Sequence, residues 1–228
     1  MKDNSRMIST TPEVRPPFNA DWQARREFAE QLRRLNHAAL TADIGAGELH
    51  ALTETLRLAA DRLEQQPRIY GRKAHAEHYA RQYKEMVDVL YEFSPALGRS
   101  NAMALPMHVW YADGRLHGHL TADWSHEGPF DSVHGGVIAL LFDQLLGIAQ
   151  RVEGKRGYTG TLSIRYNKLT PLHRPLHLVA TVKRVEGRKK FVAGEIWVDD
   201  VCTAQCEALF ITGTHVEDPL SPLQSSPA

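Results

Sequence analysis

The sequence lacks several features that would assign a protein to a class at once. Only two of its 228 residues are cysteines, Cys202 and Cys206. They fall in one predicted strand with both side chains on the same face, so they cannot cross-link a fold, and we interpret them as reduced core residues. No run of about 18 apolar residues and no basic-then-apolar leader occurs, which argues against a membrane span and against secretion. We therefore expect a cytoplasmic protein.

The sequence also has no excess of positive or negative charge and none of the common nucleotide-binding and metal-binding motifs considered below. Lysine plus arginine total 27 and aspartate plus glutamate total 27, so no net field draws the chain onto nucleic acid, and any anion site must be local. There is no P-loop, no GxGxxG after a strand and no GxSxG elbow. The twelve histidines show no HExxH spacing. We expect no nucleic-acid partner and no metal site.

What is present is a 43% apolar composition that can support a packed core, and two kinds of periodicity that divide the chain. Residues 1–20 have no periodicity and are predicted to be a disordered tail. Residues 21–95 have the helical period and form a helical extension, with a weaker third helical segment over 74–93. Residues 96–216 have the strand period and form a second domain. The proline- and serine-containing end, 217–228, is predicted to be disordered.

The helical extension is predicted to be a hairpin of two helices. Gly45 and Gly47 are expected to end the first helix, and the second is expected to begin near Glu48. Apolar residues recur at helical spacing in both, as Phe28, Leu32, Leu35 and Ala39 and then as Leu49, Leu52, Leu56, Ala59 and Leu63.

The second domain is predicted to be α+β. Alternating apolar residues predict a hairpin over 107–122 with a turn at Asp113-Gly114, and four more strands after residue 160. Between them lies the domain's only strong helix, Gly135 to Val152. This order predicts an antiparallel sheet wrapped around one central helix.

Asp143 is the unusual residue of the central helix. The helix is apolar nearly all round, so we expect it to be buried on most faces. An ionised carboxylate removed from water costs several kcal/mol unless it is paired or hydrogen-bonded. Asp143 is therefore a candidate catalytic carboxylate. The alternative is a carboxylate that caps or pairs with a structural partner, or that faces solvent.

The start of the same helix favours the catalytic interpretation. In Val133-His134-Gly135-Gly136 the paired glycines let a ligand approach the main chain, and the first amides of a helix have no intrahelical partner. Those amides can hold a carbonyl oxygen that gains negative charge, as an oxyanion hole does. The nine residues from His134 to Asp143 span about 13 Å of helix axis, too far for one reacting atom. The spacing suggests a dimer with shared sites.

These residues resemble the hotdog-fold thioesterases of the phenylacetate-pathway (PaaI-like) type, with the human THEM acyl-CoA thioesterases close in pattern. The resemblance covers about residues 102 to 213, and its most specific part is the His-Gly-Gly with an acid nine residues from the histidine. It rests on His126-Glu127-Gly128-Pro129, Val133-His134-Gly135-Gly136, Asp143, Ile164-Arg165-Tyr166, Pro171-Leu172, Glu186-Gly187-Arg188-Lys189 and Leu209-Phe210-Ile211.

The resemblance implies hydrolysis of acyl-CoA by a homodimer or homotetramer, with no metal and no cofactor beyond the CoA of the substrate. It implies that Gly135, with Gly136 beside it, supplies the oxyanion amide and that His134 orients the thioester or the loop. It makes Asp143 the general base or the nucleophile, and Thr159 the residue that positions water. Thr161, expected on the same strand face, is a second candidate for that role.

The resemblance also implies contacts to CoA from Arg165, Asn167, Arg188 and Lys189, which suit a phosphate-bearing ligand. Solvated strand ends and turns are the alternative for each of these four. Two other functions stay open. One is a non-catalytic acyl-CoA-binding regulator, which the basic residues near Arg33 keep possible, and the other is an enoyl-CoA hydratase, for which the expected DxNPxH-like motif is missing.

Overall fold

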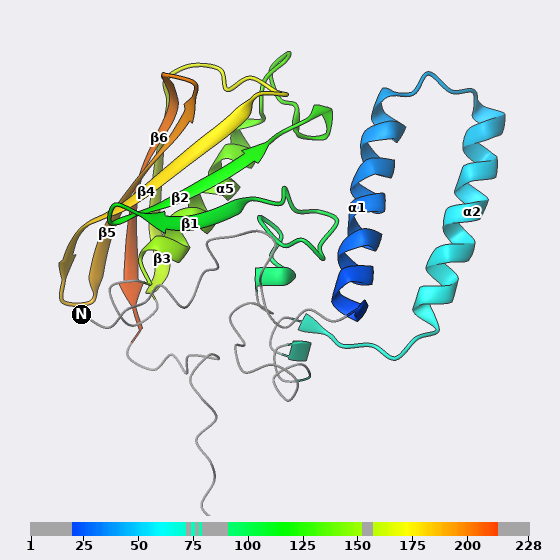
Figure 1. Cartoon of the computed structure of the whole chain (residues 1–228), viewed down its shortest axis with the longest axis horizontal. Helices are drawn as coiled ribbons and strands as arrows, with labels where there is room; N and C mark the ends of the chain where they lie inside the picture. The colour runs from blue at the N-terminus through cyan, green and yellow to red at the C-terminus, as the bar shows by residue number, and fades with distance from the viewer. Residues whose placement is uncertain (1–19, 72–73, 76–77, 79–90, 152–156, 214–228) are drawn as a thin grey trace, which may run out of the picture.

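The computed structural model describes residues 20–71, 74–75, 78, 91–151 and 157–213. A curved sheet with one helix against it forms the body, and two further helices stand beside that body (Figure 1). The predicted tails lie outside the described residues, apart from Ala20, as does most of the predicted third helical segment over 74–93. Among the helices that the structure describes, none combines the length and apolar character needed to cross a membrane.

The sheet has six strands in the order β1-β2-β4-β5-β6-β3, and every neighbouring pair is antiparallel. This confirms the predicted α+β architecture of an antiparallel sheet around one helix. The elements of this unit are β1 (His108–Ala112), β2 (Arg115–Thr121), the 3₁₀ helix η2 (Trp124–His126), α5 (Gly135–Ala149), β3 (Gly157–Tyr166), β4 (Pro175–Glu186), β5 (Lys189–Val198) and β6 (Val201–Thr212).

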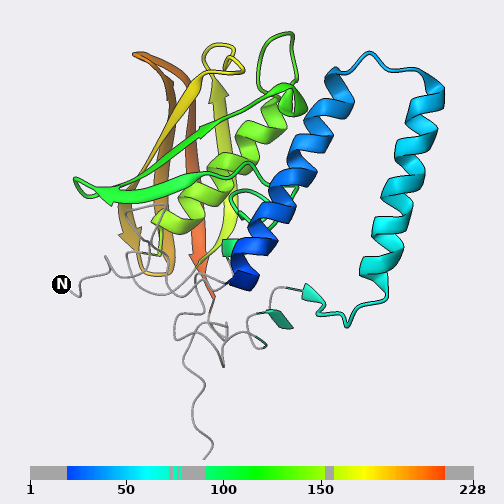
Figure 2. The ribbon, with the colours of Figure 1, turned by 45° about the vertical axis from the view of Figure 1, so that its right-hand side comes forward.

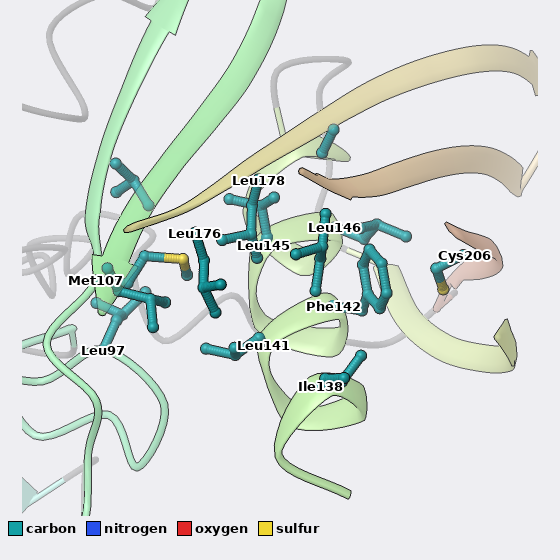
Figure 3. Close-up of a cluster of buried hydrophobic side chains, with 14 of the residues drawn as sticks. Leu97, Met107, Ile138, Leu141, Phe142, Leu145, Leu146, Leu176, Leu178 and Cys206 are labelled. Carbon is teal, nitrogen blue, oxygen red and sulfur yellow. The ribbon is translucent and has the colours of Figure 1, made fainter. Parts of the chain in front are cut away.

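Helix α5 packs on one face of the sheet because the strands alternate. In β5, for example, every second residue is buried, as expected for a sheet with one covered face. Leu141, Leu145 and Leu146 of α5 are fully buried and lie beside leucines of β4, as Figure 3 shows. At Gly194 an added Cβ would lie 2.5 Å from Leu146 Cδ1, so the absence of a side chain there lets the helix come close.

Helix α1 (Ala20–Thr41) docks on the body through a face that the sequence pattern did not indicate. Trp22 is buried, and Arg26 forms a two-pronged ion pair with the fully buried Glu92, at 2.7 Å and 2.9 Å. By contrast Phe28, on the predicted apolar stripe, is 49% exposed. The apolar stripe is therefore not the face that packs on the body, because charge-assisted bonds hold a different side of the helix.

Helix α2 (Ala46–Glu64) runs antiparallel to α1, which gives the predicted hairpin connection, but none of its residues is buried. Figure 2 shows it standing away from the body, with α1 between them. The predicted boundary needs correction as well. Helix α1 ends at Thr41, Gly45 is the N-cap residue of α2, and Gly47 lies inside α2, so the two glycines begin the second helix.

Candidate functional site

The start of α5 has one main-chain donor with no partner among the described residues, the N–H of Gly135. His134 is the N-cap residue and its Nδ1 accepts the N–H of Gly136 at 2.9 Å. The carbonyl oxygen of His134 accepts the N–H groups of Val137 and Ile138 at 2.9 and 3.1 Å. The Gly136 bond requires the His134 tautomer without a proton on Nδ1. Of the two predicted oxyanion amides, Gly136 is therefore occupied and Gly135 is available.

The loop before α5 fixes His134 in place. The N–H of His134 donates to the carbonyl oxygen of His126 at 2.8 Å, and that of Val133 donates to Thr170 O at 2.8 Å. At Gly128 an added Cβ would lie 2.6 Å from His134 Cα, which explains the glycine in the His-Glu-Gly-Pro segment. This segment therefore acts as the support of the helix start.

Asp143 and Thr159 lie together across α5 and β3. The hydroxyl of Thr159 donates to Asp143 Oδ1 at 2.8 Å. Both residues are exposed in the single chain, so the expectation that Asp143 is buried is wrong for this chain alone. Helix α5 covers the sheet with one side only, and Asp143 lies on the opposite side with the exposed Gly136 and the partly exposed Gly147. Any shielding of the acid must come from outside the described chain.

A β-bulge separates the two threonines that were predicted to share a face. Thr159 is paired with the buried Phe210, whereas Thr161 is paired with Leu209, the next residue back along β6. The register shift between them inserts one residue, Gly160, and this reverses the alternation of faces. Thr161 therefore points away from α5, and the structure does not bring it to Asp143.

Tyr166 is a residue of the site that the sequence interpretation missed. Its hydroxyl donates to the carbonyl oxygen of Gly135 at 3.0 Å. Its ring lies close against the same glycine, since an added Cβ on Gly135 would be 3.4–3.5 Å from the Tyr166 ring and hydroxyl. The two residues are 31 positions apart, and no local pattern indicates that they meet.

The four residues predicted to contact CoA lie at opposite ends of the sheet. Arg165 is paired with Gln205 of β6, and the Asn167 side chain donates to Gln205 Oε1 at 3.3 Å. Lys189, next to Arg188 in the β4–β5 turn, is paired with Ile211. These two positions on β6 are about 20 Å apart at the rise of a strand. One chain alone does not bring the four side chains together.

A cluster of histidines lies on the outer face of the sheet. The sequence interpretation missed one pattern within it. His117 and His119 have the His-x-His spacing of some metal sites. His117 Nδ1 lies 3.0 Å from Nε2 of His177, and the two rings stack on each other and on Trp110. His177 lies in β4. Within the described ranges, no group of three or more potential metal ligands has the geometry to hold an ion.

Comparison with known proteins places this geometry in a family. The family model of the thioesterase superfamily matches residues 130–204, which include α5 and both Asp143 and Thr159. The crystal structure of a thioesterase superfamily protein matches with a TM-score of 0.73 and 33% sequence identity, covering 87% of this chain and 94% of that one.

Two further structures match about half of this chain. They are a phenylacetic acid degradation-related protein from Ralstonia eutropha JMP134 (19% identity, TM-score 0.44, covering 47% of this chain and 86% of that one) and thioesterase superfamily member 2 from Mus musculus (16% identity, TM-score 0.43, covering 47% and 82%).

The match at 33% identity is long enough to include part of the N-terminal helices, because the strands and α5 span less than half of the 228 residues. The matched region therefore extends beyond the sheet and α5 into the N-terminal helices. From this match, the family model and the strand order, the chain belongs to the thioesterase superfamily and has its hotdog fold.

Proposed function

We propose that the protein hydrolyses acyl-CoA thioesters to a free acid and CoA. The observation that carries the proposal is the unpaired Gly135 N–H at the start of α5, together with the Asp143–Thr159 pair on the open side of the same helix. A thioesterase needs both a donor for the carbonyl oxygen and a group that activates water.

In the proposed mechanism the Gly135 N–H donates to the thioester carbonyl oxygen as that oxygen gains negative charge. Asp143 takes a proton from a water molecule whose oxygen bonds to the carbonyl carbon. The C–S bond then breaks, and the CoA thiolate leaves and takes up a proton. Thr159 holds one oxygen of the carboxylate and leaves the other for water. Direct attack by Asp143 to form an anhydride is the alternative role of the same side chain.

We further propose that each site is shared between two chains. Within one chain Gly135 and Asp143 are separated by about 12 Å of helix axis. Strand β3 is an edge strand whose residues are mostly exposed, and such an edge is a template for pairing with another strand. Antiparallel pairing of β3 with its copy would set two α5 helices side by side, cover each Asp143, and bring it toward Gly135 of the partner subunit.

The same pairing gives a physical account of the separated CoA residues. Antiparallel β3 strands place opposite ends of the two chains next to each other. Arg165 and Asn167 of one chain would then lie near Arg188 and Lys189 of the other. In this arrangement the phosphates of CoA are bound by positive side chains of both subunits.

The Asp143→Asn variant tests the proposal. Asparagine keeps the shape of the side chain and removes the negative charge, so we expect kcat for acyl-CoA hydrolysis to fall by about 10²- to 10⁴-fold with little change in stability. Release of the free thiol of CoA is the assay, run over a series of acyl chain lengths. Glu207→Gln, an exposed acid on the other face of β6, is the matched control and should keep full turnover.

The shared site has its own test in mixed dimers. Gly135→Pro removes the proposed oxyanion donor at the first position of a helix, where proline is tolerated. Each variant alone should be nearly inactive, whereas co-expression of Gly135→Pro with Asp143→Asn should restore about a quarter of the activity, because half of the dimers then carry one intact site of two. No recovery would contradict shared sites. Binding of CoA thioesters by the unaltered protein without any thiol release would favour a non-catalytic acyl-CoA-binding regulator.

A further inference from the structure

Helix α2 carries an apolar stripe that nothing in the described chain covers. Four leucines and one alanine recur at spacings of three and four residues, and α2 has no buried residue. The leucines are 41–53% exposed. The stripe consists of Leu49, Leu52, Leu56, Ala59 and Leu63.

This spacing is that of the a and d positions of a coiled coil. Leu49, Leu56 and Leu63 repeat every seven residues, with Leu52 and Ala59 between them. Such a repeat packs against another helix that has the same repeat. The stripe is therefore a candidate surface for pairing with another helix.

The opposite side of α2 carries charged side chains that are exposed to solvent. The guanidinium of Arg57 forms ion pairs with Glu54 and Asp61, both at 2.6 Å. These three side chains remain about half exposed or more. The apolar stripe and this group of paired charges thus lie on different faces of one helix.

Helix α1 does not supply that partner. Its docked side, with Trp22, Arg26 and Ala29, faces the body. On its other side, Phe28 is 49% exposed. If α1 and α2 buried their stripes against each other, neither set would remain this accessible. The two helices run side by side with α2 outermost (Figures 1 and 2).

The charges that flank the stripe indicate which helix fits it. Glu48 and Arg62 lie along the same edge of the stripe, near opposite ends of α2, with Thr55 midway between them. Neither charged side chain has a hydrogen-bond or ion-pair partner among the described residues. A second α2 running antiparallel would set Glu48 of each copy opposite Arg62 of the other. A parallel copy would set Glu48 near Thr53 and leave Arg62 beyond the paired region.

We propose that α2 pairs antiparallel with α2 of a second copy of this chain. The two-fold axis passes close to Thr55, Leu52 packs beside Leu56 of the other copy, and Leu49 packs beside Ala59. The helix of 19 residues is about 28 Å long, so the contact is short and works together with other contacts between copies. This surface is separate from Asp143 and Gly135 and does not depend on the proposed hydrolysis.

Engineered cysteines test the pairing directly. In a Cys202→Ser background, Thr55→Cys places a thiol near the axis, and Leu58→Cys places one on the same helix but off the stripe. Under mild oxidation we expect the Thr55→Cys protein to form a disulfide-linked dimer at least about tenfold faster than the Leu58→Cys protein, since a factor of ten corresponds to only 1.4 kcal/mol of preference. Equal rates for the two thiols would overturn the proposal.

Second substitutions in the Thr55→Cys protein identify the forces involved. Leu56→Glu, on the stripe, should slow the cross-link about tenfold or more, whereas Leu58→Glu, the same change off the stripe, should leave its rate unchanged. Glu48→Arg should slow it, and adding Arg62→Glu should restore it. An unchanged rate with Leu56→Glu, or no recovery with the charge exchange, would overturn the antiparallel arrangement. Circular dichroism confirms that α2 still folds, and thiol release from acyl-CoA, measured in parallel, reports on the proposed active site independently.

Discussion

Gly194 lies in the middle of β5 beneath α5, and replacing it with alanine tests how closely helix and sheet pack. The added Cβ would lie 2.5 Å from Leu146 Cδ1 and 3.1 Å from the ring of Phe142. Both neighbours are fully buried, so neither side chain can swing into solvent. Carbon atoms in contact are ordinarily about 3.5–4.0 Å apart, so Leu146 must change its conformation within the packed core or α5 must move away by about 1 Å.

The size of the effect follows from this overlap. Forcing an extra carbon into a packed core costs typically about 1–3 kcal/mol. For a chain of this length, 1 kcal/mol corresponds to about 2–4 °C in Tm, so Gly194→Ala should lower Tm by about 2–12 °C. Turnover should fall too, because displacement of α5 changes the 2.8 Å contact between Asp143 and Thr159, and a misplacement of about 1 Å can cost about 100-fold.

Thermal and urea unfolding, both followed by circular dichroism, provide the assay, with thiol release measured on the same samples. Gly47→Ala is the matched control, because an added Cβ there has nothing within 4 Å and alanine is favoured over glycine in a helix by up to about 1 kcal/mol. We expect the control to be as stable as the parent or more stable. If Gly194→Ala unfolded at the same urea concentration as the parent, the close packing of α5 on β5 described here would be wrong.

Three further predictions concern the surroundings of the site and the docking of α1. Tyr166→Phe removes the hydrogen bond to Gly135 O and should lower kcat by about three- to tenfold, the equivalent of about 0.5–1.5 kcal/mol, with an unchanged urea midpoint; a kcat equal to that of the parent would exclude a positioning role. Arg26→Met leaves Glu92 buried without its guanidinium and should lower the free energy of unfolding by about 3 kcal/mol, with recovery on adding Glu92→Met; additive losses in the double variant would contradict direct pairing. Burial and the neighbouring histidines of β2 lower the pKa of His177 below 6.5, so the unfolded chain binds the proton more tightly and stability should fall as the pH drops below that value. His177→Gln should weaken this pH dependence of stability, measured in urea titrations between about pH 7.5 and about pH 5.5. An unchanged pH dependence would exclude His177 as its source.

Local patterns in the sequence were sufficient for much of the fold. Alternating apolar residues gave the strands, and the long apolar segment from Gly135 gave the one helix against the sheet, because these periodicities follow from the geometry of a single element. The same holds for the start of α5. A histidine followed by two glycines already indicates exposed main-chain amides, and the family resemblance drawn from that motif is confirmed by the comparison with known proteins.

Contacts between elements were decided only by the tertiary structure. A bulge at Gly160 turns Thr161 to the outer face of the sheet, and the strand pattern could not reveal it, because one inserted residue changes the face without changing the composition. Helix α1 docks through Arg26, whose buried partner Glu92 lies 66 residues away along the chain. A pattern within one helix could not indicate that contact. The hydrogen bond from Tyr166 to Gly135 O likewise joins residues 31 positions apart, so no local pattern indicates it.

Asp143 shows what the sequence and the tertiary structure each determine. The sequence placed the acid on an otherwise apolar helix, and the structure shows that only the side facing the sheet is covered by the chain itself. Periodicity reports which residues of one element share a face. Which of those faces is covered, and by what, depends on residues distant in the chain or on another copy of it, and those distances are set only when the chain folds and assembles.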